Sequence, residues 1–134
     1  MEILRKIKQN YIKHLFIYKV YRIFKYKPLF SHSSFGEEFL VIKILKKQNG
    51  FYIDVGALNP KVGSLTFSLY KKGWRGINFD LTRSNIQLFK VFRKRDRSVQ
   101  LAISNKKARV TSYIFDPGSG LNSLEKKYAD KWKK

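Results

Sequence analysis

Cysteine is absent from this sequence of 134 residues, and histidine is nearly absent, with only His14 and His32. Without cysteine the chain can form neither disulfides nor thiolate metal sites, which agrees best with a reducing compartment such as the cytoplasm. Two histidines are too few for a dedicated zinc or iron centre, so we expect no metal site. Both histidines lie outside the segment 51–80, and the sequence offers no evident catalytic base.

Acidic residues are also scarce. Nine Asp and Glu stand against 29 Lys and Arg, which gives a formal net charge of +20 at pH 7. Such an excess favours an anionic partner, either a lipid surface, a phosphorylated substrate or, less readily, nucleic acid. The lysines are spread along the whole chain, so a well-solvated surface without a dedicated anionic partner is an equal alternative.

Long apolar runs are missing, and within residues 1–28 lysine or arginine interrupts each apolar run. No stretch reaches the roughly 20 apolar residues of a membrane-spanning helix. Residues 1–28 nevertheless repeat apolar side chains every three or four positions, which predicts a basic amphipathic helix that ends at Pro28. This helix would either lie peripherally on an anionic membrane or pack on the protein's own sheet or on a partner.

Residues 29–134 alternate short apolar runs with helix-forming segments, a pattern typical of an α/β fold with parallel strands. The first helix should follow a cap at Ser33 or Ser34 and end at Asn49-Gly50. The basic cluster 93–97 should lie in the connection that follows the expected helix 84–94. The expected strands are 51–55 (buried and parallel), 74–79, 98–103 and 108–115 (antiparallel), and the other expected helices are 65–72, 84–94 and 123–132.

The segment 51–80 carries the clearest functional pattern. A strand contains Asp54, a glycine turn follows at Gly56, and the next strand ends at Asp80, 26 residues after Asp54. Ligands of open α/β sheets bind beyond the carboxyl ends of the strands, and an acid about 20 residues after a glycine turn can bind ribose hydroxyls. We therefore expect a nucleoside-containing cofactor, although GxGxxG and the Walker-type phosphate loop are both absent. Alternatively, Asp54 caps a loop or helix and Asp80 is an ordinary strand-end acid.

Five blocks of the sequence occur in a familiar order: SSFGEEFLVIKIL, GFYIDVGALNP, SLTFSLYKKGWRGINFD, RKRDRSVQLAIS and GLNSLEKKYAD. From about Ser33 to Asp130 they resemble the FkbM-type family of S-adenosylmethionine-dependent methyltransferases. The resemblance implies a Rossmann-like class I methyltransferase fold. It also implies S-adenosylmethionine as the cofactor and methyl transfer to an oxygen of a glycan or another hydroxylated small molecule.

The same resemblance assigns the cofactor-binding residues. Asp54, Gly56 and Ala57 would line the methionine side, Asp80 would hold the ribose and Ala102 would border the adenine.

The sequence departs from the family pattern at three leucines. Leu58 stands where asparagine is common, Leu65 replaces a polar residue, and Leu81 stands where proline is frequent. The family domain has seven strands, so the resemblance implies an incomplete domain of about four strands over residues 29–134, preceded by the helix 1–28. Such a chain could form a homo-oligomer, be completed by a second polypeptide, or be inactive. The alternative function is a non-catalytic basic module that binds an anionic membrane surface or nucleic acid.

Overall fold

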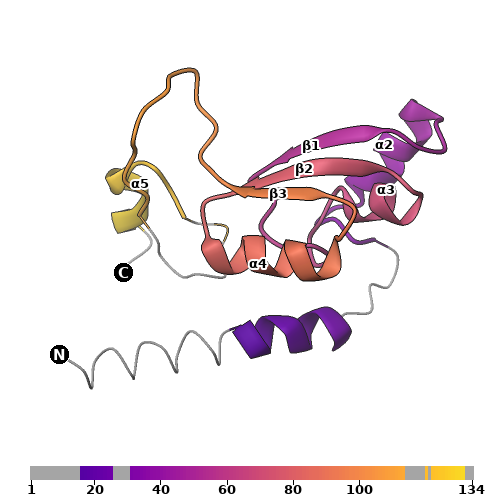
Figure 1. Cartoon of the computed structure of the whole chain (residues 1–134), viewed down its shortest axis with the longest axis horizontal. Coiled ribbons are helices and arrows are strands. Elements are labelled where there is room, and N and C mark those ends of the chain that lie inside the picture. Colours follow the sequence, from indigo (N-terminus) through magenta and orange to yellow (C-terminus); the bar gives the residue numbers. More distant parts are fainter. Residues whose placement is uncertain (1–15, 26–30, 114–119, 121, 132–134) are drawn as a thin grey trace.

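The computed structural model describes residues 16–25, 31–113, 120 and 122–131. The described part is an α/β fold, a parallel three-stranded sheet flanked by helices (Figure 1). Residues 16–25 are helical. The further elements are α2 (Glu37–Leu45), β1 (Phe51–Val55), α3 (Phe67–Lys71), β2 (Arg75–Asp80), α4 (Arg83–Phe92), β3 (Arg97–Gln100) and α5 (Lys126–Lys131).

The sheet has the strand order β1-β2-β3, with both neighbouring pairs parallel. Val55 is in register with Phe79, and Phe79 with Val99. Parallel strands require crossover connections, which α3 and α4 provide. The carboxyl ends of all three strands therefore lie at the same end of the sheet, and the expected site residues follow there.

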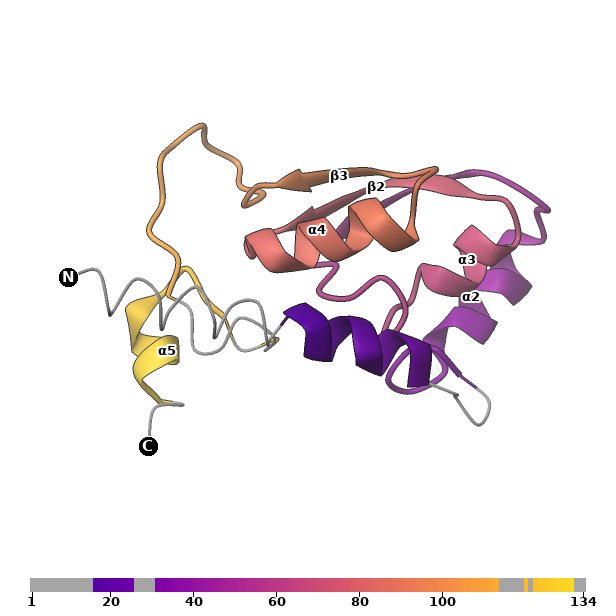
Figure 2. The ribbon, with the colours of Figure 1, turned by 60° about the horizontal axis from the view of Figure 1, so that its bottom comes forward.

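The helices beside the sheet gather on one of its faces. Figures 1 and 2 show α3, α4 and the helical segment 16–25 on the same side. Tyr52, Leu69 and Trp74 form a buried cluster there, against which Val41 and Ile42 of α2 pack. The opposite face carries no helix among the described residues, so the fold has two layers.

A close approach between β1 and β2 explains why β2 contains a glycine. A Cβ atom added at Gly76 would lie 2.2 Å from the Tyr52 ring and 2.7 Å from the Tyr52 carbonyl oxygen. The ring therefore occupies the space that any larger residue would need. This contact fixes the Tyr52 ring against β2, and the Tyr52 hydroxyl forms hydrogen bonds with Arg93 and Asp96.

Strand β1 was expected to be buried on both faces, and that prediction is wrong. Tyr52 is buried on the helix side, but Phe51, Ile53 and Val55 are exposed on the other side. The continuous apolar run suggested two covering layers, whereas only one is present around the described sheet. Among the described residues β1 pairs only with β2, so its outer edge has no partner.

The expected fourth strand is not formed over residues 108–113, and residues 114–115 lie outside the described part of the chain. Tyr113 instead makes an isolated antiparallel bridge with Ser123. The third strand ends at Gln100 rather than at residue 103. Val110 is half exposed, because no described helix covers this segment. Alternation of apolar and polar residues is not enough to stabilise a strand without such packing.

Three helix termini also differ from the prediction. No side chain caps α2, whose N-cap is Gly36, and the helix ends at Lys46 in the left-handed conformation rather than at Asn49-Gly50. Helix α3 begins after Thr66, two residues later than the predicted helix 65–72. The Ser64 hydroxyl instead accepts a hydrogen bond from the guanidinium of Arg93.

The described part of the predicted helix 1–28 packs on the domain; residues 1–15 and 26–28 lie outside the described residues. Lys19 is buried and donates hydrogen bonds to the Ser84 hydroxyl at 3.0 Å and the Asn85 side-chain oxygen at 2.8 Å, both on α4. Lys61 donates to the Ile23 carbonyl oxygen at 3.0 Å. Within the described ranges, no helix is both long and apolar enough to cross a membrane.

Candidate functional site

The carboxyl ends of the three strands bring together Asp80, the turn after β1 and the segment after β3. Asp80 ends β2 and is 8% exposed. Its Oδ1 accepts hydrogen bonds from the Thr82 amide at 2.7 Å and from the Asn85 side-chain amide at 3.0 Å. Its Oδ2 accepts from the Leu58 amide at 2.9 Å. Asp80 thus joins the loop after β1 to the start of α4.

The hydrogen bonds of Asp80 leave little spare capacity. An ionised carboxylate offers about four lone-pair positions, and three donors already use three of them. In this arrangement Asp80 can accept one further hydroxyl. Binding both hydroxyls of a ribose would require one present donor to move, and the Asn85 side chain is the most easily displaced because the other two are backbone amides.

The glycine turn after β1 is held by its backbone. The amides of Gly56 and Ala57 both donate to the Phe79 carbonyl oxygen, at 2.9 and 3.0 Å. Gly56 has a φ of 75°, a conformation that glycine adopts at little cost, and a Cβ atom there would meet nothing within 4 Å. Backbone conformation, rather than lack of space in the protein, therefore explains the glycine, and its open side is free for a ligand.

Leu58 also has a positive φ, of 53°. Such a conformation is uncommon for residues other than glycine, and asparagine and aspartate adopt it more readily than leucine. The family that this sequence resembles commonly has asparagine here. The strained position lies in the loop that Asp80 anchors, and Leu58 lines the pocket beside Asp80.

Two pockets lie at this end of the sheet. The smaller has a volume of about 130 Å³ and the larger about 280 Å³. Leu81 lines both, so the pockets adjoin. Together their volume falls at the lower end of the range of about 300–1,000 Å³ typical of ligand sites. The smaller is lined by Gly56, Leu58, Asp80, Leu81, Thr82, Asn85, Gly120 and Asn122.

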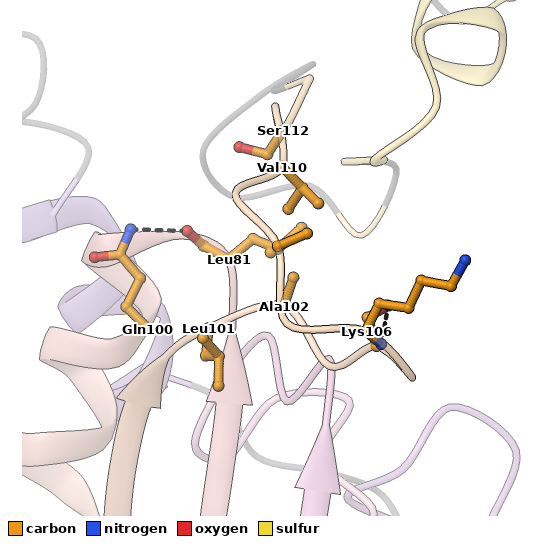
Figure 3. A pocket seen from close by; sticks show the side chains of 9 residues that line it. Leu81, Gln100, Leu101, Ala102, Lys106, Val110 and Ser112 are labelled. Carbon is orange, nitrogen blue, oxygen red and sulfur yellow. Dashed lines mark hydrogen bonds between the residues drawn. The ribbon is translucent and has the colours of Figure 1, made fainter.

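The larger pocket lies between the end of β3 and the segment that follows it (Figure 3). Leu81, Ala102 and Val110 contribute apolar atoms, while Gln100 and Lys106 contribute polar side chains. The Gln100 side-chain amide donates to the Leu81 carbonyl oxygen at 3.0 Å, which ties the end of β3 to the residue after β2. A mixed lining of this kind suits a planar heteroaromatic ring with polar edges.

Of the five predicted cofactor-binding residues, three line these pockets and two do not. Gly56 and Asp80 line the smaller pocket, and Ala102 lines the larger. The Asp54 carboxylate accepts a hydrogen bond from the Thr66 hydroxyl at 2.7 Å, on the helix side of the sheet. Ala57 is buried. Asp54 therefore holds the residue before α3, and Ala57 packs inside the loop after β1.

Sequence reasoning did not identify Thr82 and Asn85 as site residues. Thr82 precedes the first residue of α4, and Asn85 lies in its first turn. The signal for Asn85 was its polar side chain shortly after the strand-end acid, close enough to bond back to Asp80. Thr82 donates from its backbone amide, so its residue type gave no signal. Among the described residues, no group of three carboxylate or imidazole side chains is arranged to hold a metal ion.

Comparisons of the chain with models of protein families, with curated proteins and with solved structures found no significant match. The methyltransferase family therefore stays a prediction from the sequence, and the coarser α/β fold is what the structure establishes.

Proposed function

We propose that the chain binds S-adenosylmethionine at the two adjoining pockets and transfers its methyl group to an oxygen of a glycan or another hydroxylated small molecule. The observation that carries this proposal is the position of Asp80. This buried acid ends a central parallel strand and lines a pocket next to the one lined by Ala102. In open α/β sheets a nucleoside ligand binds beyond the carboxyl ends of the strands, with an acid that bonds the ribose.

The residues present fit the three parts of this cofactor. Asp80 has one free acceptor position for a ribose hydroxyl. Gly56 lacks a side chain where the methionine part would approach the turn. Ala102 is small enough to leave room for an adenine ring beside Leu81 in the larger pocket. In this proposal the domain is a partial Rossmann-like methyltransferase fold.

When bound, the cofactor supplies a methyl group activated on a sulfonium. The protein's part is to orient that group toward the acceptor hydroxyl and to exclude water, and positioning of this kind contributes much of the acceleration of bimolecular reactions. A general base would add roughly 10²–10⁴-fold. No described side chain in the two pockets is suited to that role, so we assign no catalytic residue.

Isothermal titration of the full chain with S-adenosylmethionine tests the proposal. We expect binding that weakens at least about tenfold in Asp80→Asn and in Ala102→Phe, which fills the larger pocket. Glu125→Gln removes the same charge at an exposed position and should bind normally. Because Asp80→Asn also weakens the loop, circular dichroism must accompany it, and Ala102→Phe tests the pocket without touching Asp80. Absence of binding by the unaltered chain contradicts the proposal.

A second candidate function rests on the outward face of the helical segment 16–25. Lys19 and Ile23 are buried against the domain, whereas Tyr18, Tyr21 and Phe24 are more than half exposed. Arg22 and Lys25 lie on the same exposed side, as does Ile17. Aromatic rings with neighbouring cations fit the headgroup region of an anionic membrane, to which the net charge of +20 would also be attracted.

Vesicle flotation distinguishes this second function. We expect binding to phosphatidylglycerol-containing vesicles, weaker binding in high salt, and little binding to phosphatidylcholine alone. The double variant Tyr18→Ser and Tyr21→Ser should lose most of the binding. Lys46→Gln with Lys47→Gln, at the end of α2, is the control. Equal binding by the tyrosine variant would show that the charge alone attracts the protein and that this helix face is not the contact.

A further inference from the structure

The face of the sheet opposite the helices is apolar and uncovered by any described element (Figure 1). On the edge strand β1, Phe51 is 62% exposed, Ile53 65% and Val55 59%. Large side chains of this kind normally lie under a second layer in parallel sheets. Their exposure together marks an interaction surface rather than scattered surface residues.

The strand register shows that this surface is continuous. Ile53 is opposite Ile77, and Val55 is opposite Phe79, which is in turn opposite Val99. Residues that face each other in register project to the same side of the sheet. The bare face therefore consists of Phe51, Ile53, Val55, Ile77, Phe79 and Val99.

The charges on this face have a single sign. Arg75 is in register with Phe51, and Arg97 with Ile77, so both arginines lie on the bare face at the amino ends of their strands. Both are exposed. Asp54 and Asp80 fall on the other side because alternate residues of a strand point to opposite faces. The surface is thus an apolar field with two cations at one end and no carboxylate.

We propose that the bare face binds an amphipathic helix of an acidic partner polypeptide. Its apolar stripe would cover the six apolar residues, and its carboxylates would reach Arg75 and Arg97. Helices are the elements that cover the faces of parallel sheets. A second copy of this chain fits less well, since each copy carries a net charge of +20 and the same two arginines. This inference does not depend on the proposed methyl transfer.

Fluorescence anisotropy with two labelled synthetic peptides tests the proposal. Both carry one leucine stripe, with glutamates on the polar face of the first and lysines on that of the second. The full chain should bind the glutamate peptide and not the lysine peptide. Ile53→Asp should weaken binding at least about tenfold. Ile44→Asp, at a similarly exposed position on α2, is the matched control and should bind normally.

A charge reversal separates recognition from a folding defect. The double variant Arg75→Glu and Arg97→Glu leaves the apolar residues intact, and it should bind the glutamate peptide at least about tenfold more weakly while keeping the circular dichroism spectrum of the unaltered chain. Sedimentation velocity provides the competing outcome. A concentration-dependent dimer that Ile53→Asp abolishes would assign the face to a second copy and overturn the acidic partner. Equal binding of both peptides, or of neither, would also overturn it.

Discussion

Arg93 donates a hydrogen bond from Nη1 to the hydroxyl oxygen of Tyr52, 2.9 Å away, in the interior between the sheet and its helices. Arg93 is fully buried, and its other two nitrogens also donate hydrogen bonds. Nε bonds the Pro60 carbonyl oxygen at 2.8 Å, and Nη2 bonds the Ser64 hydroxyl at 2.6 Å. One arginine at the end of α4 therefore holds β1 and the loop that leads from the candidate site to α3.

The charge of Arg93 is balanced from two directions. The Asp96 carboxylate, with a fully buried side chain, lies 3.6 Å from Nη1. The rings of Phe67, Tyr70 and Phe89 surround the guanidinium at 5.2–5.4 Å, within the range of cation–π attraction. Burial of a charge is tolerated only with pairing of this completeness.

Arg93→Met should lower the free energy of unfolding by about 3–5 kcal/mol, because it leaves the Asp96 carboxylate buried without its cation. Arg93→Lys should recover only part of this loss, since an ammonium cannot replace the planar set of donors. Urea denaturation followed by circular dichroism measures both. Lys94→Met, at the exposed neighbouring position, is the control. Equal effects at positions 93 and 94 would contradict the structural role of Arg93.

Tyr52→Phe isolates the hydroxyl in this network. The hydroxyl donates to Asp96 Oδ2 at 2.5 Å and accepts from Arg93. Its loss should cost about 1–3 kcal/mol of stability, because it leaves buried partners unsatisfied while the ring still packs on Gly76. Thermal unfolding at neutral pH measures the cost. A stability equal to that of the unaltered chain would show that the two partners compensate for the missing hydroxyl.

The pKa of the same hydroxyl gives a second measurement. Burial, together with the hydrogen bond to Asp96, raises the pKa of Tyr52 well above its usual value of 10. A raised pKa stabilises the fold fully below the unfolded value and loses that contribution as the pH rises above it. Ultraviolet titration should therefore show one tyrosine fewer ionising near pH 10 in the folded chain than in the denatured chain.

The order of strands and helices over residues 51–100 could be predicted from the sequence, because glycines and apolar runs mark the ends of short elements there. The parallel arrangement and the place of Asp80 followed from that order. The burial of Arg93 could not be predicted, since it lies in a run of charges that is typical of an exposed connection. Its partners Tyr52 and Ser64 are 41 and 29 residues away in the sequence, and only the folded chain brings them together.

The bare face was hidden from sequence reasoning for a related reason. An apolar strand looks the same whether helices cover both its faces or one, because the covering layer comes from distant segments or from another chain. The pairing of β1 with β2 could be anticipated from the sequence. Whether a helix would cover the sheet face that carries Ile53 and Phe79 could not. For the site, the acid and the glycine were identified, whereas the donors Thr82 and Asn85 required the geometry of the turn.

Glu38 predicts a specific dependence of stability on pH. Burial of this carboxylate opposes its ionisation, but hydrogen bonds from the Ser33 hydroxyl and the His32 amide outweigh that effect and lower its pKa from 4.5 to about 2. The Ser31 hydroxyl also donates, at 2.9 Å. A lowered pKa contributes stability above the unfolded value of 4.5, and that contribution is lost as the pH falls from 4.5 through 2.

Glu38→Gln should therefore destabilise the fold by about 1–3 kcal/mol near neutral pH, as expected for hydrogen bonds to a charged group. The difference from the unaltered chain should shrink steadily below pH 4.5. Urea midpoints measured at several pH values give this curve, with the exposed Glu125→Gln as the control. A difference that stays constant with pH would mean that packing, rather than charge, explains the effect.

Leu58→Asn should stabilise the protein, although it replaces an apolar residue with a polar one. The φ of 53° at Leu58 is strained for leucine and tolerated by asparagine, and relief of such strain is worth on the order of 1 kcal/mol. Leu65→Asn makes the same chemical change at a position without positive φ and with partial exposure, so it should be neutral or destabilising. Thermal melts compare the two. Stabilisation by both variants would exclude backbone strain as the cause. Stabilisation by Leu58→Asn alone would show that the loop bonded to Asp80 holds Leu58 in a backbone conformation that leucine disfavours.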